Sequence, residues 1–71
     1  MNVDVMAPED WRAEIARLGV PAYRIAALIP VHPTRFSRWL WGRERMPSRA
    51  KWRLAQVLEE ERVARQKAGA R

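Results

Sequence analysis

The sequence contains no cysteine, a single histidine and only three glycines among its 71 residues. Without cysteine the chain can form neither a disulfide framework nor a thiolate metal site, and one histidine cannot form a histidine cluster. We identify no Gly-rich phosphate loop, no carboxylate-only metal loop and no set of nucleophile, histidine and acid. We therefore expect no enzymatic activity, no cofactor, no metal and no small-molecule ligand.

Long apolar runs are missing as well. The longest one, residues 25–31, is far shorter than the ~20 residues that a membrane span needs. The first six residues, MNVDVM, include an acidic residue and no basic one, which is not typical of a secretory signal. We expect a cytoplasmic protein that does not contact membranes.

Positive charge, in contrast, is abundant and concentrated. The net charge is +6, and the stretch from His32 to Arg53 holds seven basic residues against Glu44 alone. The rest of the chain sums to zero, with seven basic and seven acidic residues. Charge of one sign concentrated in this way is typical of a protein that binds a polyanion, although a merely solvated surface can have the same composition.

Apolar residues recur at helical spacing, and no segment alternates with a period of two. The sequence predicts four helices, over residues 8–18, 21–28, 33–41 and from 49 into the sixties. We expect a single all-α domain: a compact bundle of about four helices in which the second and third form a helix-turn-helix. Residues 1–6 are expected to be a loose lead-in, and residues 62–71 a polar tail that frays. His32 is expected to be an indifferent N-cap of the third helix.

Helical spacing also predicts which side chains face the core. The expected core residues are Trp11, Ile15, Leu18, Ile25, Ala26, Ile29 or Leu28, Phe36, Trp39, Leu40, Trp52, Ala55 and Leu58, with Leu54 as a further candidate. Trp41 falls on the side of Arg38 instead. It could cover the following loop, which we favour, or contact a sugar–phosphate edge or a dimer partner.

The segment IAALIPVHPTRFSRWLWGRERMP resembles the lambda-repressor-like, Cro-type (XRE-like) helix-turn-helix domains of small phage and bacterial regulators. The positions that agree are Ile25 and Ala26 in the second helix, Val31 in the turn, Phe36 and Trp39 in the recognition helix, and Gly42 and Pro47 in the following loop. Two positions depart from the pattern: Pro30 stands where glycine is common, and Ala22 where glutamine is common. The turn is therefore expected to differ in detail.

The third helix supports a DNA interface without the family. At ~100° per residue, Phe36, Trp39 and Leu40 share one side, and polar residues occupy the other. Arginine can donate two parallel hydrogen bonds to guanine, and threonine or serine can bond to several bases. Together with the resemblance, which implies base contacts at these positions, this side of the helix predicts Thr34, Arg35, Ser37 and Arg38 as the residues that contact bases. Those expected to contact phosphates are Arg24, His32, Arg43, Arg45, Arg49 and Lys51, although each could be an ordinary surface residue.

These observations and the resemblance imply a sequence-specific regulator that binds double-stranded DNA. We expect a repressor of Cro type in a bacterial host cell or its nucleoid, bound to a palindromic operator as a homodimer, at least on DNA. The alternative is a protein-interaction or antitoxin-like adaptor whose helix-turn-helix is vestigial. It needs an exposed apolar patch, for which the end of the last helix offers only Val57, Val63 and Ala64. A membrane-bound basic helix does not fit, because the charge spans two helices and a loop.

Overall fold

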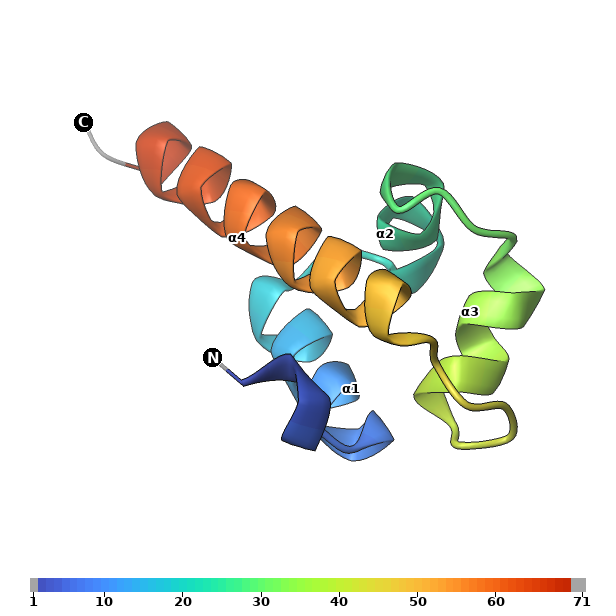
Figure 1. Ribbon diagram of the computed structural model, residues 1–71. Coiled ribbons are helices and arrows are strands. Elements are labelled where there is room, and N and C mark those ends of the chain that lie inside the picture. The colour runs from blue at the N-terminus through green and yellow to red at the C-terminus, as the bar shows by residue number, and fades with distance from the viewer. Residues whose placement is uncertain (1, 70–71) are drawn as a thin grey trace.

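The computed structural model of the chain describes residues 2–69, which form helices and no strand (Figure 1). The elements, in order, are a 3₁₀ turn η1 (Val3–Val5) and the helices α1 (Pro8–Leu18), α2 (Ala22–Leu28), α3 (Pro33–Leu40) and α4 (Ser48–Gly69). The predicted all-α architecture of four helices is confirmed. Within the described residues, no helix is both long enough and apolar enough to cross a membrane.

Proline and glycine set the helix ends, as expected from the sequence. Pro8 and Pro33 occupy the start of α1 and α3, where a missing N–H leaves no helical bond unmade. The Asp10 carboxylate accepts a hydrogen bond from the Ala7 N–H at 2.8 Å and so caps the start of α1. Gly19 ends α1 with a φ of 73°, a left-handed conformation that side chains with a Cβ rarely adopt.

The core lies where α2 and α3 pack on each other and both meet the flanking helices. α1 contacts α3 and α4, and α2 contacts α3 and α4, so the helix-turn-helix packs against the pair formed by α1 and α4. Phe36 is 1% exposed, and its ring meets that of Trp39 edge to face, with centroids 6.5 Å apart. The predicted core residues of the first three helices that are buried are Trp11, Ile15, Ile25, Ala26, Ile29, Phe36, Trp39 and Leu40.

Two predictions about packing are wrong. The expected loose lead-in forms η1, which packs against α4 with Val3 fully buried, because an apolar side chain gains by leaving water. Trp52, expected in the core, is 56% exposed. On α4 it lies ~160° around the helix from Leu54, which is buried together with Val57 and Leu58.

The C-terminal part of α4 also differs from its prediction. The expected fraying beyond residue 62 is not seen, since α4 continues as a helix to Gly69, and residues 70–71 lie outside the described residues. Residues 62–68 are exposed, and this end of α4 extends past the other helices (Figure 1). The side chain of Glu61 reaches back to Arg24 of α2 at 3.9 Å.

Two arginines from the flanking helices bind the C-terminal ends of the two helices of the helix-turn-helix. Arg53 of α4 donates to the carbonyls of Leu28 at 2.9 Å and Ile29 at 3.2 Å, at the end of α2. Arg12 of α1 donates in the same way to the carbonyl of Leu40, at the end of α3. The last carbonyls of a helix have no hydrogen-bond partner within the helix, and they carry partial negative charge. A guanidinium supplies both a hydrogen-bond donor and a positive charge.

Replacing Arg53 by methionine is therefore expected to lower the free energy of unfolding by about 1–2 kcal/mol, because charged hydrogen bonds to two carbonyls are lost while the aliphatic stem remains. Urea unfolding followed by circular dichroism measures the change. Arg49→Met, at an exposed position one turn earlier on α4, is the matched control and should change stability by less than about 0.5 kcal/mol. Equal stability of the two variants would refute the capping role.

Candidate nucleic-acid interface

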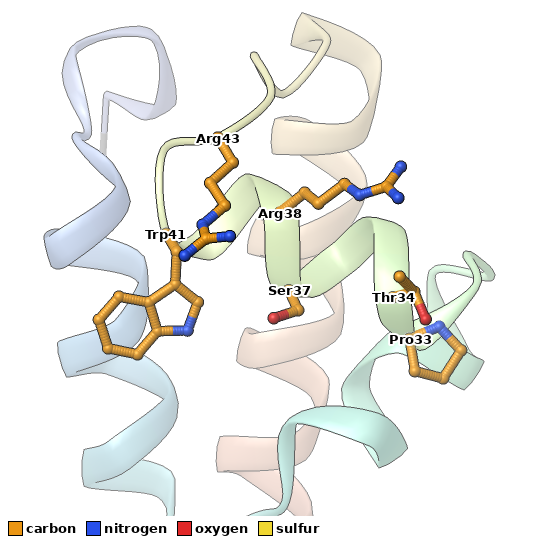
Figure 2. A pocket seen from close by; sticks show the side chains of 6 residues that line it. All are labelled: Pro33, Thr34, Ser37, Arg38, Trp41 and Arg43. Carbon is orange, nitrogen blue, oxygen red and sulfur yellow. The ribbon is translucent and has the colours of Figure 1, made fainter.

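The exposed side of α3 forms an open concavity. Its lining residues are Pro33, Thr34, Ser37, Arg38, Trp41 and Arg43, which we call the α3 surface. Figure 2 shows Pro33 and Trp41 near its two ends, with Ser37 between them. All six residues are exposed, whereas the opposite side of the helix is buried in the core. Three of the four predicted base-contacting residues, Thr34, Ser37 and Arg38, thus lie together here.

The backbone at both ends of α3 fixes this surface. At the start, the His32 ring accepts a hydrogen bond from the Thr34 N–H at 3.1 Å through Nδ1, so His32 is a true N-cap and not the indifferent one expected. At the end, Gly42 adopts a φ of 72°, and the chain turns back so that the Arg43 N–H bonds the Arg38 carbonyl at 2.9 Å. The turn brings the side chain of Arg43 onto the α3 surface.

Arg35, the fourth predicted base contact, occupies the flank of α3. Its Nε lies 3.7 Å from Oε2 of Glu44, the one acidic residue in the basic stretch. It lines a neighbouring groove that it shares with Arg49 of α4 and the apolar side chain of Val31. Oε2 of Glu44 is buried and has no hydrogen-bond partner among the described residues, so the ion pair leaves its acceptor incompletely satisfied.

The six predicted phosphate contacts are distributed around the helix-turn-helix and are not brought together at one point. Arg43 lies on the α3 surface, and Arg49 in the groove beside Arg35. Arg45 and Lys51 line a separate small cavity near the start of α1. Arg24 lies on α2, where it pairs with Glu61 of α4.

His32 stands at the start of α3 with its ring exposed. Because Nδ1 accepts the Thr34 N–H, a neutral ring carries its proton on Nε2, which is then the atom able to donate to an anion. Arg53, which contributes to the basic stretch, is used inside the protein to cap α2. Part of the excess positive charge in this stretch therefore stabilises the fold.

Trp41 has a contact that the sequence did not indicate. The following loop was its favoured contact, and Arg43 of that loop lines the same concavity as Trp41. In addition, the guanidinium of Arg12 lies 4.1 Å from the centre of the Trp41 ring. The spacing of Trp41 from Thr34 and Ser37, seven and four residues, did show that all three share one side of the helix. Nothing in the sequence indicated Arg12, which belongs to another helix.

No family model matches the sequence, and no curated protein or solved structure is similar enough to count as a match. The resemblance of the helix-turn-helix segment to Cro-type domains therefore stays a prediction.

Proposed function

We propose that the protein is a sequence-specific transcriptional regulator that binds double-stranded DNA by placing α3 in the major groove. The observation that carries the proposal is the coincidence of two features on one helix. The exposed side of α3 presents hydrogen-bonding side chains, Thr34, Ser37 and Arg38, and this helix lies within the stretch that holds the whole net charge of +6. A surface that only contacts water needs neither hydrogen-bonding side chains on one helix nor the net charge gathered around that helix.

The shape of the molecule suits this proposal. The major groove is about 12 Å wide and admits one α-helix with its side chains. α3 lies at the right-hand edge of the molecule in Figure 1, and its inner side contacts α2 and α1. Thr34, Ser37 and Arg38 supply donors and acceptors for base edges, and arginine can bind guanine O6 and N7 through two hydrogen bonds.

Phosphate contacts would hold the helix in place. Arg43 beside the α3 surface, Arg49 across the neighbouring groove and the His32 ring at the start of α3 flank the helix on different sides. Such contacts fix orientation and carry no sequence information directly. With a palindromic operator, two copies would occupy half-sites about one helical turn (~34 Å) apart, and repression would follow from occupancy of the operator.

Salt dependence tests the proposal. If each copy contacts four to six phosphates, the logarithm of the binding constant should fall with the logarithm of salt concentration with a slope of about −4 to −5. Arg43→Ala should weaken binding to all duplexes alike and make the slope shallower by about one. Arg17→Ala, on the exposed side of α1, is the control and should leave the slope unchanged. Affinity for duplex DNA that hardly responds to salt would contradict the proposal.

Glu44 offers a test of the opposite sign. Its carboxylate lies beside Arg35 within the basic stretch, where it repels a phosphate and competes with it for the guanidinium. Glu44→Gln is expected to raise the affinity for any duplex by roughly 2–5-fold at low salt, a change typical of one partly exposed charge pair. Fluorescence titration of random duplex measures it, with Glu60→Gln on α4 as the control. A loss of affinity would mean that Glu44 acts by supporting the fold.

Val57, expected in the apolar patch of the adaptor alternative, is buried in the core. The observation that favours this alternative is the exposure of Trp52 and Val63 on α4, at 56% and 38%. Both lie on the same side of the helix, but the polar Gln56 and Glu59 lie between them on that side. An interaction surface of this kind would bind a protein partner with little dependence on salt. The salt titration therefore separates the two candidates.

A further inference from the structure

Trp41 continues the row of polar residues on the α3 surface. It follows Thr34 by seven residues, so it lies on the same side of the helix, about 10 Å further along the axis. The indole is 63% exposed and lines the same concavity as Ser37 and Arg38 (Figure 2). Trp41 is thus a large aromatic side chain at the end of this row, with an apolar ring face that a bound partner can bury and an indole N–H that can stay in water.

The indole is also held in position. The guanidinium of Arg12 lies 4.1 Å from the ring centre, and the same guanidinium donates to the carbonyl of Leu40. Arg12 and Trp41 together line a shallow depression on the side of α1, whereas Trp41 alone of the two borders the α3 surface. A cation–π contact thus supports the ring from the α1 side and leaves it available on the side of α3. A ring fixed in advance loses little conformational freedom when it binds.

We propose that Trp41 contacts the 5-methyl group of a thymine at one end of the site bound by α3. This inference rests on the proposed DNA-binding function. The thymine methyl is the apolar group that base edges present in the major groove, so it is the group an indole in that groove can bury. The rise from Thr34 to Trp41 corresponds to about three base-pair steps, which places this thymine about three base pairs from the base beside Thr34.

A contact with the deoxyribose edge would bury the indole equally well, and the two contacts predict different dependence on sequence. The deoxyribose is the same in every nucleotide, so a contact with it does not depend on the base. A methyl contact distinguishes thymine from uracil, which lacks the methyl group and pairs identically. Replacing single thymines by deoxyuridine in a bound duplex therefore separates them.

The experiment uses the full chain and a duplex site obtained by selection from a random pool. Each thymine of one half-site is replaced in turn by deoxyuridine, and the dissociation constant is measured. The wild-type protein is expected to bind one of these duplexes about 4-fold more weakly, the equivalent of one buried methyl group. Trp41→Ala should abolish that difference and leave the preferences at other positions, while Trp41→Phe, which keeps an aromatic ring, should retain part of it. Trp52→Ala removes a tryptophan of similar exposure on α4 and should change nothing.

Three results would overturn the inference, in distinguishable ways. If the wild-type protein binds the selected site but every deoxyuridine substitution is silent, the thymine contact is wrong and the proposed function stands. If Trp41→Ala weakens binding while the difference between thymine and uracil persists, the indole contacts the backbone. If the wild-type protein binds no duplex in a salt-dependent way, the proposed function fails together with the inference.

Discussion

Replacing Phe36 by alanine is expected to lower the free energy of unfolding by about 3–5 kcal/mol, the usual effect of removing a buried phenyl ring. Phe36 is 1% exposed and packs edge to face on Trp39, so the cavity left behind lies where α3 meets the rest of the core. A chain of 71 residues has a total stability of only ~4–10 kcal/mol. The variant should therefore lose roughly a third or more of the total stability.

Urea denaturation with far-ultraviolet circular dichroism checks this prediction. Ser37→Ala changes the next residue on the same helix, where the side chain is exposed, and should leave stability unchanged or slightly raised because alanine favours helices. If Phe36→Ala lowered the free energy of unfolding by less than about 1 kcal/mol, the Phe36 ring could not be what holds α3 against the core. The orientation of its exposed side would then lose its basis.

Replacing Arg38 by alanine is expected to weaken binding to a selected duplex by about 5–150-fold, the equivalent of about 1–3 kcal/mol for a bidentate contact with guanine. The side chain is exposed at the middle of the α3 surface, so stability should not change (Figure 2). The preference for one base pair of each half-site should be lost, and the preferences elsewhere should remain.

Competition titrations against duplexes changed at single base pairs measure this effect. Arg62→Ala is the control, because Arg62 lies on the exposed end of α4 and pairs with Glu59. A uniform loss of affinity across all duplexes would demote Arg38 to a phosphate contact. The base contacts would then have to come from Thr34 and Ser37.

The helix ends and most of the core could be predicted from the sequence because their causes are local. Pro8, Gly19, Pro33 and Gly42 set the ends of their helices by restricting or freeing the backbone of single residues. In α3, three apolar residues out of eight define one buried side without ambiguity. The exposed side, and with it the candidate site, follows directly.

The packing of α4 could not be predicted in this way. Its apolar residues are few among many charged ones, so helical spacing allowed a core side with Trp52, Ala55 and Leu58. The buried side is instead set by Leu54, Val57 and Leu58. The burial of Val3 depends on α4 as well, which follows it by more than forty residues. Contacts between residues that lie so far apart in the sequence leave no periodic signal in it.

The individual tasks of the arginines were equally hidden. Arg53 and Arg12 cap helices that lie far from them in the sequence, and Arg35 pairs with Glu44 across the loop. All three look alike in a count of charges. The count located the basic region, but it could not tell which of its arginines stabilise the fold and which are exposed. That division is a property of the tertiary arrangement, in which helix ends with unpaired carbonyls come within reach of particular side chains.

Selection of binding sites from a random pool of DNA duplexes tests the central claim most directly. If α3 contacts bases in the major groove and two copies bind symmetrically, the pool should converge on a palindrome with half-sites about one helical turn apart. Arg38→Ala should recover the same palindrome with one base pair of each half-site relaxed. A pool that shows no enriched sequence after repeated selection, while the protein is folded, would contradict the claim that this protein recognises DNA sequence.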